Sequence, residues 1–104
     1  MVSSDQIKTW VLESLEKVKA GDSAYEEIAL SPRTPVLGTS SAFASIAITA
    51  FATDLEEKIE DATGETFIFN VEEICALHKG KSNISVEELS GILEKLLTRM
   101  RQRG

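Results

Sequence analysis

The stretch AFASIAITAFATDLEEKI at residues 42–59 decides the fold, because its apolar residues recur every three or four positions. This spacing predicts an amphipathic helix that begins at about Ser41 or Ser45, ends at about Ala62 and is stopped by Gly64. A serine at the start of a helix is a common N-cap. The apolar stripe of this second helix consists of Ile48, Phe51, Ala52, Leu55 and Ile59.

A first helix is predicted from SSDQIKTWVLESLEKVKAGD at residues 3–22. Ser3 or Ser4 supplies its N-cap, and Gly21 ends it. Trp10 is expected to anchor this helix in the core. Its apolar face consists of Ile7, Trp10, Val11, Leu15 and Val18.

Two more helices are predicted after the second one. The segment ETFIF at residues 65–69 reads as an extended connector, and Asn70 then caps a short helix, VEEICALHKG, that Gly80 closes. Ser85 and Glu88 have the spacing of a capping box at the start of a last helix. The apolar residues of that helix are Leu89, Ile92, Leu93, Leu96 and Leu97.

Between the first two helices, residues 22–44 lose the helical pattern. The segment SPRTPVLGTSS has both prolines of the chain and favours turns and extended backbone, with a short helical turn expected around residues 24–30. A loop of this length in a small domain usually either has a function or indicates that an element has been misassigned. The sequence therefore predicts a single all-α domain over residues 1–104, a four-helix bundle with a long first loop, a short third helix and a core that includes Phe43, Phe51, Phe67 and Phe69.

The charge of the chain narrows the class of partner. Asp and Glu outnumber Lys and Arg by 17 to 11, which gives a net charge of −6 and argues against nucleic acid as a ligand. Basic partners are expected instead. The basic run TRMRQRG at residues 98–104 suits the C-terminal end of a helix. A single cysteine, no signal-peptide pattern and no apolar run near the ~20 residues that cross a bilayer indicate a soluble, cytoplasmic protein.

Catalytic and metal-binding patterns are weak. Cys75 and His78 lie three residues apart, but no second histidine or cysteine completes a zinc site, so we expect no metal and a buried structural cysteine. The six glycines are dispersed and form no phosphate-binding loop. Because no nucleophile, base and orienting group occur together, the chain is not expected to be an enzyme.

The segment from VLG through ASIAITAFATDLEEKIED, residues 36–61, resembles the acyl carrier protein family of phosphopantetheine-binding carrier domains. That family has an Asp-Ser-Leu triplet at the start of its second helix and a Leu-Glu-Glu segment about three turns later. Aligning Leu55, Glu56 and Glu57 with that segment puts Ser45 at the modified serine and Ile46 at the leucine. The segment NVEEICALHKGKSNISVEELSGILEKLL, residues 70–97, is similar to the last two helices of the family.

The resemblance implies a bundle of acyl-carrier-protein type and a function. Ser45 would hold a 4′-phosphopantetheine arm whose thiol carries an acyl or aminoacyl group as a thioester, for fatty-acid, lipid or secondary metabolism. The partners would be a phosphopantetheinyl transferase and acyl- or aminoacyl-transferring enzymes with basic docking patches, and the protein would be a monomer. The predicted partner-binding residues on the second helix are Ile46, Asp54, Glu56, Glu57 and Glu60.

Two alternatives stay open at this point. Ala44 stands where the family has its aspartate, so the chain fits an unmodified carrier-like bundle that binds proteins through its acidic second helix, with Ser45 as an ordinary polar residue of a helix start. A slipped register would make Ser41, one helical turn earlier, the modified residue instead of Ser45. The register with Ser45 keeps the apolar stripe in phase.

Overall fold

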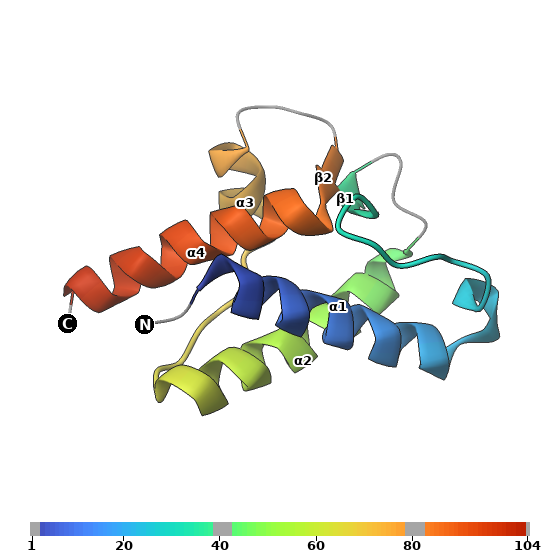
Figure 1. Ribbon diagram of the computed structural model, residues 1–104, viewed down its shortest axis with the longest axis horizontal. Helices are drawn as coiled ribbons and strands as arrows, with labels where there is room; N and C mark the ends of the chain where they lie inside the picture. The colour runs from blue at the N-terminus through green and yellow to red at the C-terminus, as the bar shows by residue number, and fades with distance from the viewer. Residues whose placement is uncertain (1–2, 39–42, 79–82, 104) are drawn as a thin grey trace.

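The computed structural model describes residues 3–38, 43–78 and 83–103 of the chain, except for the side chains of Ser45 and of residues 101–103. Its described part is mostly helical and also has a short 3-10 turn and a small sheet (Figure 1). The elements are α1 (Ser4–Gly21), η1 (Ser23–Tyr25), β1 (Pro35–Gly38), α2 (Ser45–Thr63), α3 (Val71–Leu77), β2 (Asn83–Ser85) and α4 (Val86–Arg103).

Helix α1 lies between α2 and α4 and contacts both (Figure 1). The predicted apolar stripes form a shared core, which confirms the helical periodicity read from the sequence. Trp10, Val18, Ile48 and Ala52 are only partly buried and pack against this core. The buried stripe residues are Ile7, Val11 and Leu15 of α1, Phe51, Leu55 and Ile59 of α2, and Leu89, Ile92, Leu93, Leu96 and Leu97 of α4.

The predicted N-caps of α1 and α3 are confirmed. Ser3 Oγ accepts a hydrogen bond from the backbone N–H of Gln6 at 3.2 Å. Asn70 Oδ1 accepts one from the N–H of Glu73 at 3.1 Å. Each bond satisfies one of the backbone donors that the first turn of a helix leaves without an intrahelical partner.

The start of α4 and the end of α2 also follow the prediction. The N–H of Ser85 donates to Glu88 Oε1 at 3.1 Å, and the N–H of Glu88 donates to Ser85 Oγ at 3.2 Å, so the capping box forms in both directions. Gly64 ends α2 with φ at 75°, a left-handed conformation that glycine adopts without strain. Helix α3 ends at Leu77, whereas Gly80, its predicted stop, lies outside the described residues.

The prediction of an all-α fold is wrong in one respect, because β1 and β2 form an antiparallel two-stranded sheet. Leu37 pairs with Ile84, Gly38 with Asn83 and Pro35 with Ser85, and the register shifts between Pro35 and Leu37. Strands of four and three residues are too short to show an alternating pattern. The sheet ties the long connection between α1 and α2 to the residues before α4.

The aromatic core is as predicted, with Phe43, Phe51, Phe67 and Phe69 all buried. The rings of Phe51 and Phe69 meet edge to face, with 5.7 Å between their centroids. Residues 65–69 form a connector without helix or strand. Among the described residues, no helix has both the length and the apolar character needed to cross a membrane.

Candidate functional site

Ser45 is the first residue of α2, which selects Ser45 over Ser41 as the helix start among the described residues. The N-cap is Ala44, whose methyl group can accept no hydrogen bond, so this residue makes no side-chain cap hydrogen bond. Ala44 therefore offers the first turn of α2 no side-chain acceptor of the kind that Ser3 offers α1 and Asn70 offers α3. The side chain of Ser45 and the whole of Ser41 lie outside the described residues.

Tyr25 holds the residues that precede Ser45. Its hydroxyl accepts a hydrogen bond from the N–H of Ala44 at 3.1 Å. Its ring lies against Phe43, with 5.1 Å between the ring centroids, and only 9% of the residue is exposed. Tyr25 could not be recognised from the sequence, because a single tyrosine in a non-periodic segment gives no signal of such a contact.

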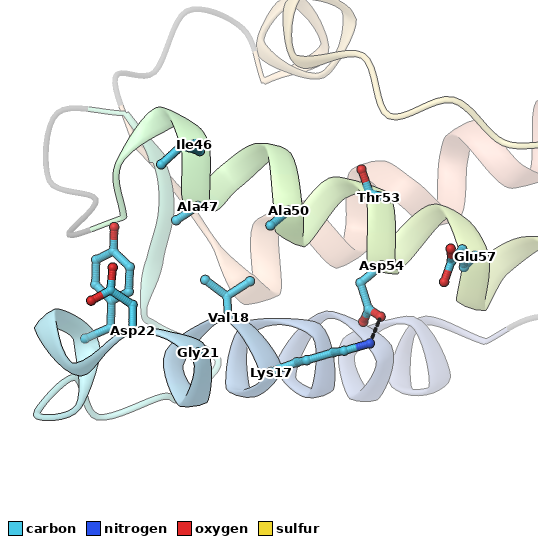
Figure 2. Close-up of a pocket in the computed structure, with 11 residues that line it drawn as sticks. Lys17, Val18, Gly21, Asp22, Ile46, Ala47, Ala50, Thr53, Asp54 and Glu57 are labelled. Carbon is cyan, nitrogen blue, oxygen red and sulfur yellow. Dashed lines mark hydrogen bonds and ion pairs between the residues drawn. The ribbon is translucent and has the colours of Figure 1, made fainter.

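A groove of about 570 Å³ runs between α1 and α2 from the start of α2 (Figure 2). Figure 2 shows Val18 pointing from α1 toward Ala47 and Ala50 on α2. Ile46 lies beside Ser45 in sequence and is 83% exposed. The residues that line the groove are Lys17, Val18, Gly21, Asp22, Tyr25, Ile46, Ala47, Ala50, Thr53, Asp54 and Glu57.

Asp54 lines one side of this groove and makes a hydrogen bond and an ion pair with residues of α1. Its Oδ2 accepts a hydrogen bond from Ser14 Oγ at 2.8 Å, and its Oδ1 lies 3.0 Å from Lys17 Nζ, the contact dashed in Figure 2. Lys58 Nζ lies 3.5 Å from Oδ2. The side chain of Asp54, a predicted partner-binding residue, is only 12% exposed and is directed to α1.

The ionisation of Asp54 follows from these contacts. Desolvation raises the pKa of this carboxyl, but the hydrogen bonds from Lys17 and Ser14 and the charge of Lys58 outweigh it, so the net pKa is below its ordinary value. The hydrogen bond to Asp54, together with its charge, raises the pKa of Lys17. Asp54 is therefore a charged contact between α1 and α2.

The other predicted partner-binding residues divide into two groups. Glu56 Oε2 accepts a hydrogen bond from the backbone N–H of Phe69 at 2.6 Å, which holds the connector after α2 against the helix. Glu57 and Glu60 are exposed, as is Ile46. These three residues form an exposed surface on α2, which we call the α2 outer surface.

A second cavity, of about 350 Å³, lies on another side of α2. The α2 residues that line it are Ile48 and Thr49. They follow Ser45 by three and four positions and so lie on the same face of the helix as Ser45. The cavity thus adjoins the face of α2 on which Ser45 lies. Its lining residues are Val36, Leu37, Gly38, Phe43, Ile48, Thr49 and Val71.

Cys75 is exposed, so the prediction of a buried structural cysteine is wrong. Helix α3 has seven residues, and its buried residue is Ile74, whereas the next residue, Cys75, lies at the surface. His78 Nε2 lies 3.0 Å from the carbonyl oxygen of Asn83 and 3.3 Å from Glu88 Oε2, which joins the end of α3 to the start of α4. Within residues 3–38, 43–78 and 83–103, no group of three or more His, Cys, Asp or Glu side chains could hold a metal ion.

Comparisons of the chain with protein-family models, with curated proteins and with solved structures find no match. The residues around the start of α2 are therefore the best indication of function.

Proposed function

We propose that the protein is an acyl carrier protein that bears a 4′-phosphopantetheine arm on Ser45 and presents an acyl or aminoacyl thioester to partner enzymes. The observation that carries this proposal is the position of Ser45 as the first residue of a 19-residue helix without a side-chain cap. Backbone N–H groups at such a helix start, together with the helix dipole, favour a phosphate group. The phosphodiester of the arm would be such a group.

The order of the elements supports a bundle of acyl-carrier-protein type. Two long helices are separated by a long connection, and a short α3 precedes a long amphipathic α4. The family resemblance implies this same order. The two short strands add a feature that the resemblance alone does not imply.

The residues near Ser45 also fit an arm and its cargo. The cavity of about 350 Å³ adjoins the Ser45 face of α2 and includes the apolar side chains of Val36, Leu37, Phe43 and Ile48. Small-molecule sites are commonly mostly apolar cavities of this size range. An acyl chain of modest length would remove its apolar surface from water there.

Loading of the protein is a group transfer by a partner enzyme. The Ser45 oxygen forms the new phosphodiester, the pyrophosphate bond of coenzyme A breaks, and adenosine 3′,5′-bisphosphate leaves. The chain supplies the hydroxyl and its position, and the transferase supplies the catalysis. The α2 outer surface, with Ile46, Glu57 and Glu60, suits basic patches on the transferase and on later partner enzymes.

Intact-protein mass spectrometry tests this proposal. The protein is incubated with coenzyme A, magnesium and a broad-specificity phosphopantetheinyl transferase, beside a Ser45→Ala variant. We expect the mass of one phosphopantetheine group on the parent and no gain on the variant. An unmodified parent, after a cognate transferase has also been tried, would contradict the proposal.

A second candidate function is an unmodified carrier-like bundle that binds a protein through its acidic second helix. The groove between α1 and α2 favours it, because the exposed Ile46 and the carboxylates of Asp22 and Glu57 border an apolar floor. A cationic amphipathic peptide is the direct probe. In this case Ile46→Ser, which removes the exposed apolar side chain without adding charge, would weaken binding measured by calorimetry, and Ser45→Ala would bind as the parent does.

A further inference from the structure

We infer that Tyr25 is a positioning residue for the modification of Ser45. Its hydroxyl holds the backbone of Ala44 and so sets the orientation in which α2 presents the serine to the transferase. The inference rests on the proposed function. It goes beyond that function because it assigns a role to a residue that lies 19 positions before Ala44 in the chain.

The contacts of Tyr25 join it to both residues that precede Ser45. The hydroxyl accepts a hydrogen bond from the N–H of Ala44 at 3.1 Å. The ring packs on the ring of Phe43, with 5.1 Å between the two centroids. A polar contact and an apolar contact from one side chain thus fix the backbone immediately before the helix. Rotation of this backbone would change the direction of the first turn of α2.

The start of α2 needs such a contact because it has no capping residue of its own. In a capping box, the N-cap N–H is bonded by the side chain three residues later, which here is Ala47 and has no acceptor. Tyr25 supplies the missing acceptor from a different part of the chain. Without it, the N–H of Ala44 loses its partner at a part-buried position, and the first turn is expected to fray.

Tyr25 is itself well fixed. Asp22 Oδ1 accepts the N–H of Ala24 at 2.9 Å, which caps the turn η1 on which Tyr25 lies. This turn directly follows the end of α1. The orientation of Ser45 is therefore set relative to α1, the helix that contacts both α2 and α4.

The test compares Tyr25→Phe with the parent in steady-state loading by the transferase, because this change removes the hydroxyl and keeps the ring. The hydrogen bond is of ordinary strength, so we expect kcat/KM to fall about fivefold, mainly through kcat. Ser90→Ala is the matched control. It deletes another buried hydroxyl, one that donates to the carbonyl oxygen of Val86 at 2.8 Å within α4.

Amide hydrogen exchange at Ala44 gives a readout that does not depend on loading. We expect faster exchange at Ala44 in Tyr25→Phe and parent-like exchange there in Ser90→Ala. Loading of the parent combined with equal loading of Tyr25→Phe would overturn this inference alone. If Tyr25→Phe and Ser90→Ala lose stability and loading to the same extent, the effect of Tyr25 is one of stability alone, and the inference is overturned too. If the parent is not loaded, the proposed function fails and this inference fails with it.

Discussion

The hydroxyl of Ser14 lies 2.8 Å from Oδ2 of Asp54, and this hydrogen bond joins the buried face of α1 to the middle of α2. Ser14 is fully buried, so Asp54 is the group that satisfies its hydroxyl between the helices. Lys17 binds the other oxygen of the same carboxylate. The pair sets how α1 and α2 lie against each other along the groove that starts beside Ser45.

Replacing Asp54 is expected to destabilise the fold. In Asp54→Ala the hydroxyl of Ser14 loses its partner at a buried position, so the free energy of unfolding should fall by about 1 to 3 kcal/mol. Urea denaturation measures the change. Glu57→Ala, which removes an exposed carboxylate of the same helix, should change the unfolding free energy by less than about 0.5 kcal/mol. Equal effects of the two substitutions would contradict this role of Asp54.

The stability that Asp54 contributes should depend on pH. Because its pKa is lowered in the folded state, the contribution is complete above the unfolded-state pKa and is lost as the pH falls through the folded-state value. The difference in unfolding free energy between the parent and Asp54→Asn should therefore be constant near neutral pH and shrink below about pH 4. A difference that grows on acidification would have the wrong sign for this account.

Glu56 should matter for stability although it belongs to the acidic surface read from the sequence. Its carboxylate accepts the backbone N–H of Phe69 at 2.6 Å, and hydrogen bonds to charged groups contribute about 1.5 to 3 kcal/mol. We expect thermal unfolding of Glu56→Ala at a clearly lower temperature than that of the parent. Glu60→Ala is the control, because Glu60 is exposed on the same helix. Parent-like unfolding of Glu56→Ala would show that the contact contributes little.

If the proposed carrier function holds, an aspartate at position 44 should stabilise the start of α2 and speed loading by the transferase. Asp in place of Ala44 would cap α2 and place a negative charge at its N-terminus. This should raise the free energy of unfolding by about 1 kcal/mol. We expect Ala44→Asp to be loaded faster than the parent by the same transferase. Ala62→Asp adds the same charge near the other end of α2 and should not accelerate loading. A slower or unchanged loading rate for Ala44→Asp would contradict this prediction.

The helices, and the N-caps of α1, α3 and α4, could be predicted from the sequence because their signals are local. Apolar spacing of three and four residues marked the buried stripes, and each cap involves a partner three residues away, as in Ser85 and Glu88. The exposed Cys75 was missed because α3 is short, and one buried residue, Ile74, decides its orientation.

The contacts that shape the candidate site are not local. Tyr25 reaches Ala44 over 19 residues and Glu56 reaches Phe69 over 13, and in both cases the partner is a backbone N–H that every residue except proline has. Such a partner leaves no trace in the amino-acid pattern. The pairing of β1 with β2 was hidden for the same reason, since main-chain groups far apart in the sequence make its hydrogen bonds.

The most direct test of the central claim is to locate the arm on a single serine. Chymotrypsin cleaves after Phe43 and Phe51, so it places Ser41 and Ser45 in different peptides, with Ser45 in the peptide of residues 44–51. After incubation of the protein with coenzyme A and the transferase, this account predicts the phosphopantetheine mass on residues 44–51 and not on the peptide that ends at Phe43. The mass on the peptide with Ser41, or on neither peptide, would contradict it.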